Sequence, residues 1–211
     1  NEAFTTTNRE DYPMNYNKDQ KCTRTDRGLK GISLGNQSIA VYGDISSSTP
    51  AYTYLSKRAF QAKPGETLTP AVQYKGIWMH SYVYVDLNNN GRFEPKVEAG
   101  QIVPDAGNEL MAYSFLSASD ENSGFNSAGT EISGNGRNTL SMPAFTLPDT
   151  LQHGFYRMRY KVDWNSSDAG GSIEANNHII NNGGGAMDIR LNVHGDNVTI
   201  TQGAPNGKVV A

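Results

Sequence analysis

Residues 156–164, YRMRYKVDW, alternate strictly between large apolar side chains and charged ones. Alternation with a period of two is typical of a β-strand that buries one face and exposes the other. The apolar side chains are Tyr156, Met158, Tyr160, Val162 and Trp164, and the charged ones are Arg157, Arg159, Lys161 and Asp163. We therefore expect the first set to lie in a hydrophobic core and the second set to face solvent.

Two further stretches are also expected to form strands. Residues 187–193 repeat the alternation, with Met187, Ile189, Leu191 and Val193 facing the core and Asp188, Arg190, Asn192 and His194 facing solvent. Residues 78–86 are instead apolar at both parities, which predicts a strand that is buried on both faces within a sheet. A shorter apolar run at residues 110–116 predicts another strand.

The first half of the chain carries the signals of β-hairpins. Residues 32–41 predict a hairpin that turns at Gly35 and Asn36, and residues 60–74 predict a second one around Pro64 and Gly65. Long stretches rich in Gly, Ser and Asn follow at residues 118–138 and 165–185. These patterns predict an all-β fold: an antiparallel two-sheet β-sandwich of the jelly-roll or Ig-like type with long polar loops.

The chain is expected to contain one domain with polar ends. Residues 1–28 are polar and predict an arm or linker, residues 29–201 the β-sandwich, and residues 202–211 a second linker. The single cysteine, Cys22, falls in the arm, so no disulfide within the chain is possible. Because Asn1 is not a translation start, we expect that an N-terminal segment, such as an export signal, once preceded it.

Composition limits the possible partners. The 211 residues carry a net charge of −3, and the Lys and Arg residues are scattered along the chain. A nucleic-acid-binding domain would show a basic patch, so that class is not expected. No stretch approaches the about 20 apolar residues of a membrane-spanning helix. A single thiol is compatible with a cytosolic protein and also with a bacterial secreted or surface-anchored protein that a metal ion stabilises in place of disulfides. The oxygen-rich loop described next favours the second.

The predicted strand at 78–86 runs into a loop with the oxygen spacing of a calcium site. Asp86, Asn88 and Asn90 occupy alternate positions, a glycine follows, and the carboxylates of Glu94 and Glu98 come next. Calcium requires several oxygen ligands, which alternate side chains around a glycine turn can supply from one short segment. An ordinary turn is the alternative reading, because Asn and Gly also tolerate the positive φ angles of turns.

The sequence carries no catalytic constellation. Glycoside hydrolysis needs two carboxylates about 5 to 10 Å apart. The candidates are Asp120, Glu121, Asp163, Asp168 and Glu174, which lie in or beside polar loops without a pairing motif. The histidines are His80, His153, His178 and His194, and none accompanies a nucleophile motif; we expect His80 to be packed within a strand. We therefore predict that the protein is not an enzyme.

Three segments resemble, in order, the GEVED-type domains of secreted and surface proteins of Bacteroidetes and related bacteria. YVYVDLNNNGRFEPKVEAG (residues 82–100) is similar to the family's strand and loop, GFYRMRYKV (154–162) to a later strand, and GGGAMDIRLNV (183–193) to the segment that carries the acidic family motif. The resemblance covers about residues 78–193. In the last segment Asp188 is the one acid, with Gly185, Ala186 and Met187 before it.

This resemblance implies a non-catalytic accessory module of an exported, glycan-processing multidomain protein. Its calcium ligands would be Asp86, Asn88, Asn90, the Arg92 carbonyl and either Glu94 or Glu98. Carbohydrate is a candidate partner beside the other domains of the same polypeptide, because Trp78, Tyr82 or Tyr84 could stack on a sugar ring. The alternatives are a structural or adhesive surface domain and, less favoured, a glycoside hydrolase.

Overall fold

The computed structural model describes residues 21–22, 24–98, 101–103, 105, 107–117, 123–133, 138–164, 169, 179 and 183–195. The strands within these residues are β1 (Gly28–Leu34), β2 (Gln37–Ala40), β3 (Tyr52–Ala62), β4 (Thr67–Leu68), β5 (Pro70–Lys75), β6 (Met79–Val85), β7 (Val97–Glu98), β8 (Gln101–Ile102), β9 (Leu110–Tyr113), β10 (Ser123–Phe125), β11 (Glu131–Ser133), β12 (Phe145–Thr146), β13 (Gly154–Trp164) and β14 (Gly184–Val193). The fold is all-β, as predicted.

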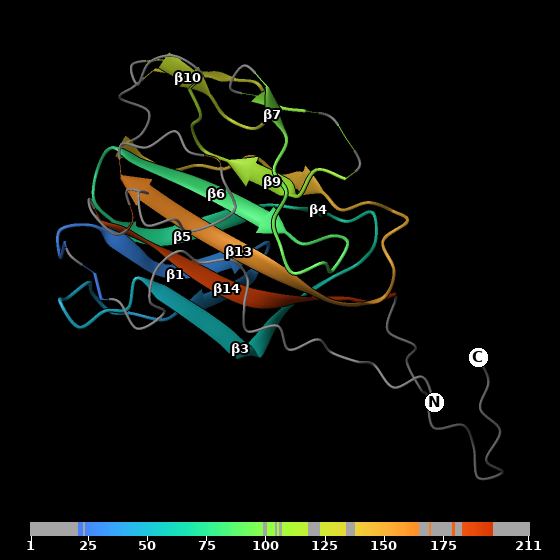
Figure 1. Ribbon diagram of the computed structural model, residues 1–211, viewed down its shortest axis with the longest axis horizontal. Helices are drawn as coiled ribbons and strands as arrows, with labels where there is room; N and C mark the ends of the chain where they lie inside the picture. Colours follow the sequence, from blue (N-terminus) through green and yellow to red (C-terminus); the bar gives the residue numbers. More distant parts are fainter. Residues whose placement is uncertain are drawn as a thin grey trace, which may run out of the picture.

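A five-stranded sheet in the order β3-β14-β13-β6-β9 forms the centre of the fold (Figure 1). The long strands β13 and β14 pair antiparallel, with Met158 opposite Ile189 on one side and opposite Val85 of β6 on the other. The sheet departs from the antiparallel expectation at one place, because β3 runs parallel to β14. As predicted, β6 is an inner strand and is buried on both faces.

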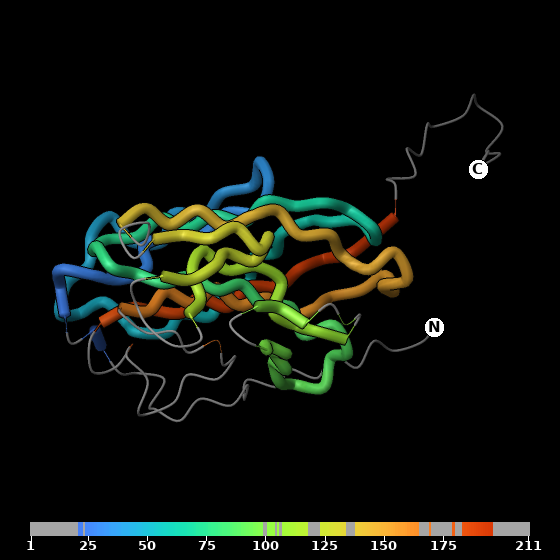
Figure 2. The backbone as a smooth tube through the Cα atoms, turned by 90° about the horizontal axis from the view of Figure 1, so that it is seen from above, coloured from blue at the N-terminus to red at the C-terminus, as the bar shows by residue number. Residues whose placement is uncertain are grey.

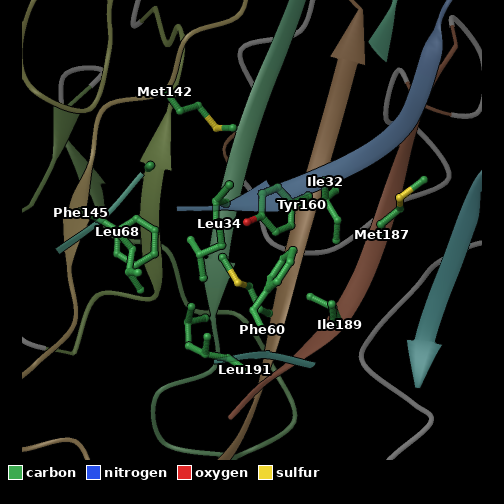
Figure 3. Packing of buried hydrophobic residues seen from close by; sticks show 14 of the residues in the cluster. Ile32, Leu34, Phe60, Leu68, Met142, Phe145, Tyr160, Met187, Ile189 and Leu191 are labelled. Atoms are coloured by element: carbon green, nitrogen blue, oxygen red, sulfur yellow. The ribbon is translucent and has the colours of Figure 1, made fainter. Parts of the chain in front are cut away.

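The second sheet, β2-β1-β5, packs against one face of the first and completes a sandwich (Figure 3). Between them lies the predicted core, in which each of Met158, Tyr160, Val162, Ile189, Leu191 and Val193 is buried. The hydroxyl of Tyr160 donates a hydrogen bond of 2.7 Å to the carbonyl of Ser33 in β1, so its polar atom is satisfied inside the core. The expectation for the apolar faces of β13 and β14 is confirmed.

The opposite face of this sheet is also buried, and the expectation that its charges face solvent was wrong. Arg157, Arg159, Lys161, Asp163 and Asp188 are all buried. The segment that follows β6 lies on this side of the sheet, away from β1 (Figure 2). Strand alternation separates two faces but does not determine whether another part of the chain covers the second one.

Buried ion pairs make this arrangement possible. The Asp188 carboxylate accepts hydrogen bonds from Arg159 Nε at 2.6 Å and Nη2 at 2.9 Å, from Arg157 Nη1 at 3.1 Å and from the Tyr52 hydroxyl at 3.0 Å. The Arg157 guanidinium lies 3.7 Å from the centre of the Tyr54 ring. Lys161 Nζ pairs with Asp163 at 3.1 Å. Charges are tolerated in an interior when they are paired and hydrogen-bonded in this way.

Two expectations about the first half of the chain are corrected. Residues 60–74 do not form a hairpin, because β3 joins the five-stranded sheet, β4 pairs with β12 and β5 pairs with β1. The end of the expected arm also packs into the domain, where Cys22 is buried and the Arg27 guanidinium lies 4.1 Å from the centre of the Trp164 ring. The hairpin of residues 32–41 forms as predicted, between β1 and β2.

Candidate metal site

The loop of residues 86–94 leaves β6 and folds back around the side chain of Asp86. This carboxylate is buried and accepts the backbone N–H of Asn90 at 3.1 Å and that of Gly91 at 2.9 Å. Asn89 (φ 54°) and Gly91 (φ 85°) have left-handed backbone conformations, which asparagine and glycine adopt more readily than other residues. The Asn-Gly run thus makes the tight turn that brings later residues back to Asp86.

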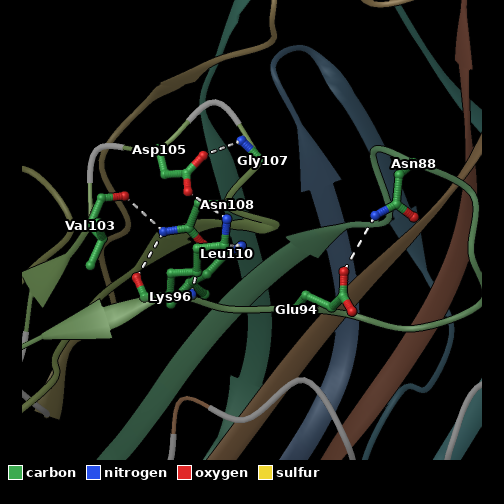
Figure 4. Close-up of polar contacts among 8 residues, drawn as sticks. All are labelled: Asn88, Glu94, Lys96, Val103, Asp105, Gly107, Asn108 and Leu110. Carbon is green, nitrogen blue, oxygen red and sulfur yellow. Dashed lines mark hydrogen bonds and ion pairs between the residues drawn. The ribbon is translucent and has the colours of Figure 1, made fainter.

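Three of the predicted ligands converge on one side of this loop. Glu94 Oε2 accepts hydrogen bonds from Asn88 Nδ2 at 3.4 Å and from Asn90 Nδ2 at 3.2 Å (the first is drawn in Figure 4). The amide oxygens of Asn88 and Asn90 accept the backbone N–H groups of Asn90 and Arg92, each at 2.9 Å. The alternate spacing seen in the sequence therefore places Asn88, Asn90 and Glu94 together.

The chemistry of these donors fits a calcium ion. Their carboxylate and amide oxygens are ligands that hard cations prefer, and an oxygen that already accepts one N–H bond retains a lone pair for coordination. The amide nitrogens of Asn88 and Asn90 face Glu94 in this structure, so both amide groups would have to turn for their oxygens to join Glu94 around a cation. Within the described residues, no three His, Cys, Asp or Glu side chains gather as a metal cluster. A site in this loop would therefore rely on the neutral oxygens of Asn88 and Asn90, which favours the weak affinities of extracellular calcium modules.

Glu94 and Glu98, the two candidates for the last carboxylate ligand, have different surroundings in the structure. Glu94 contacts the loop directly, whereas Glu98 belongs to β7 and pairs with Gln101 of β8. No hydrogen bond joins Glu98 to the loop among the residues that the structure describes. Arg92 is exposed and lies in the loop through its backbone, two residues before Glu94. The geometry therefore favours Glu94 over Glu98 as a ligand.

Glu109, which the sequence analysis did not single out, anchors the loop of residues 86–94 through hydrogen bonds to its backbone. Its buried carboxylate accepts the backbone N–H groups of Leu87 at 3.0 Å, Asn88 at 3.4 Å and Glu94 at 2.9 Å. Burial, and then the nearby Asp86 carboxylate, raise the pKa of Glu109 to about 6. Because burial and the neighbouring negative charge disfavour ionisation of Glu109, a cation bound nearby would favour its charged form.

The preceding residue, Asn108, fastens the neighbouring hairpin (Figure 4). Its amide oxygen accepts the N–H groups of Lys96 at 3.0 Å and Leu110 at 3.1 Å. Its amide nitrogen donates to the carbonyls of Lys96 at 2.8 Å and Val103 at 2.9 Å. Adjacent residues before β9 thus secure both the β7–β8 hairpin and the loop of residues 86–94, which we call the metal loop because it is the candidate metal site. In the sequence, the only sign of this role is that two polar residues, Asn108 and Glu109, directly precede the predicted strand at residues 110–116.

We expect Asn108→Ala to lower the free energy of unfolding by about 2 kcal/mol, because it leaves several backbone groups of the hairpin without partners. Urea denaturation measures this change. Lys96→Ala is the matched control in the same hairpin. It removes a solvent-exposed ion pair with Asp105 and should lower the free energy by less than about 1 kcal/mol. Equal effects of the two substitutions would contradict the role of Asn108.

Comparison with known families matches residues 80–188 to the GEVED domain, which is more than half of the chain. The chain belongs to the GEVED domain family. The matched region begins in β6, contains the metal loop, Asn108, Glu109 and all of β13, and ends at the buried Asp188. No curated protein matches the chain.

In this GEVED domain the aromatic residues suggested for carbohydrate stacking have different environments. Tyr82 and Tyr84 are fully buried, in a cluster with Tyr113 and Leu110. Trp78 precedes β6, is 37% exposed and has a positive φ of 62°. Of the three, Trp78 alone is at the surface, and it lies at the opposite end of β6 from the metal loop.

Two of the remaining candidates for catalysis, Asp163 and His80, lie in the interior of the GEVED domain. Asp163 is buried beside Lys161. His80 is buried with its ring centre 5.0 Å from that of Phe115, so its expected packing within a strand is confirmed. The candidates that lie outside the described residues are Asp120, Glu121, Asp168, Glu174 and His178. Within the described residues there is no helix that is long and apolar enough to cross a membrane.

Proposed function

We propose that this GEVED domain is a non-catalytic accessory module of an exported bacterial protein, and that a calcium ion in the loop of residues 86–94 stabilises it. Family membership supports the accessory role. The observation that carries the calcium proposal is the convergence of Asn88 and Asn90 on Glu94, next to the buried Asp86. The ordinary-turn alternative explains the backbone conformation of Asn89 and Gly91 but does not require a carboxylate at Glu94.

A calcium ion would act here as a structural clamp. The loop connects the end of β6 to the segment before β7, and its Phe93 ring lies 4.8 Å from the Arg159 guanidinium. Fixing the loop therefore also fixes part of the cover over the buried Arg159–Asp188 pair. The chain has a single cysteine and cannot form an internal disulfide, so a metal clamp would replace that kind of cross-link.

Calorimetric titration of metal-free protein with calcium tests this proposal. We expect one binding event, and we expect Glu94→Gln to weaken it by at least about tenfold, because a charged ligand becomes neutral. Glu98→Gln is the control, since Glu98 lies in the β7–β8 hairpin, and it should leave the affinity unchanged. The absence of binding heat in the wild type, or equal effects of the two substitutions, would reject this ligand set.

Carbohydrate is the partner that we propose for the module, within a secreted or surface-anchored protein that processes glycans. Trp78 supports a surface role, because a bulky residue at positive φ is uncommon and such strain is concentrated at functional positions. Its indole ring could cover the apolar face of a sugar. Glycan-array binding by the wild type, weakened by Trp78→Ala, is the expected result.

We expect the purified domain to show no turnover of polysaccharides or aryl glycosides. Asp163, the one described member of the candidate acids, is engaged by Lys161 at 3.1 Å in the interior, where a substrate does not reach it. The assay should compare the wild type with Asp168→Asn and Glu174→Gln. Turnover that either substitution abolishes would replace the accessory assignment with a hydrolase.

A further inference from the structure

A cavity of about 310 Å³ lies between the metal loop and the turn that precedes β13. Its apolar lining comes from Leu87, Leu151 and Tyr156, and its polar lining includes Asn88, Thr150 and Gln152. Thr150 and Gln152 are exposed, whereas Tyr156 is buried and its hydroxyl bonds to the Gln152 carbonyl at 2.8 Å. The cavity thus has an apolar interior and a polar rim, at the lower end of the size range of ligand pockets.

The residues that line the cavity are suited to a neutral ligand rather than an ionic one. No Lys, Arg or His lines it in the described part of the chain, so an anion would find no counter-charge. The one charged lining residue is Glu109, and both of its oxygens already hold backbone N–H groups of the metal loop. A neutral ring with an apolar face and hydroxyl edges matches this lining, because amide and hydroxyl side chains can bond to hydroxyls while the leucines and the tyrosine cover the apolar face.

We propose that this cavity binds one ring of a neutral carbohydrate. The proposal rests on the carbohydrate partner proposed above and adds a second sugar-binding position, at the opposite end of β6 from Trp78, so Trp78→Ala should leave the binding of single sugars to the cavity unchanged. Asn88 both lines the cavity and belongs to the calcium ligand set, and Leu87 precedes it in the same loop. Calcium that orders the loop therefore also orders one wall of the cavity, and sugar affinity should be higher with calcium than with EDTA.

Titration of ¹⁵N-labelled protein in calcium with the methyl glycosides of glucose, galactose, mannose, xylose and N-acetylglucosamine tests this assignment. We expect saturable amide shifts at residues 87–88, 107–109 and 150–152 with at least one of them. Gln152→Ala should weaken that binding about fivefold through the loss of one hydrogen bond. Gln101→Ala, an exposed residue of β8, should leave it unchanged. Thr150→Trp, which places a large ring at the rim, should abolish it.

Parallel titrations of Trp78→Ala distinguish a failure of the cavity proposal from a failure of the proposed carbohydrate binding. Sugar binding that Trp78→Ala abolishes, while Thr150→Trp leaves it intact, would reject the cavity as the site and retain a carbohydrate-binding module. Absence of binding to these glycosides and to a glycan array would reject both. Amide spectra of each variant establish that it is folded, so a loss of binding can be assigned to the site.

Discussion

Asp188→Asn should lower the free energy of unfolding by about 3 to 5 kcal/mol, which is the range for breaking a buried charge pair from one side. Asp188 is the shared anion for Arg157 and Arg159, and all three side chains are almost completely shielded from solvent. The asparagine retains the size of the side chain but removes the negative charge, so two buried guanidinium groups lose their counter-ion. Urea denaturation followed by tryptophan fluorescence measures the change.

Asp26→Asn is the matched control for this experiment. Asp26 also pairs with two arginines, Arg24 and Arg27, but its side chain is 54% exposed. Water screens such a pair, so the loss should be less than about 1 kcal/mol. If Asp188→Asn has an effect as small as that of Asp26→Asn, the buried pair does not contribute to stability in the way that its geometry indicates.

Calcium at a hundredfold excess over its dissociation constant should raise the free energy of unfolding by about 2.7 kcal/mol, because the unfolded loop binds it poorly. Asp86→Asn should remove most of this increment. Asp86 also accepts two backbone N–H groups, so the substitution lowers stability without metal as well. The informative quantity is therefore the difference between melting curves in calcium and in EDTA, measured separately for each variant.

Asn89→Gly is the control at the same loop. Asn89 has a φ of 54°, which glycine adopts without steric strain, whereas alanine at this position would add strain that is unrelated to metal. Its side chain does not occupy one of the alternate ligand positions, so the calcium increment should persist. Coincident melting curves in calcium and in EDTA for the wild type would indicate that the loop is an ordinary turn.

The sequence by itself determined the features that depend on near neighbours along the chain. The period of two identified β13 and β14 and the side chains that they direct into the core, because successive residues of a strand point to opposite faces. The apolar character of both parities identified β6 as an inner strand. The spacing of Asp86, Asn88 and Asn90 identified the loop whose side chains the structure brings together with Glu94. Each of these features is local.

Only the tertiary structure decided the features that depend on distant segments. Arg159 and Asp188 have the sequence pattern of a solvent-facing side, yet both are buried. Phe93, from the segment after β6, packs on Arg159, and the pairing of Arg159 with Asp188 makes burial possible. Glu109 reaches the metal loop because β9 pairs with β6, which no local pattern reveals. Glu94 likewise contacts the loop and Glu98 does not because Glu98 already belongs to β7. Pairing and coverage are made between residues far apart in the chain, so the environment of a side chain depends on the whole fold.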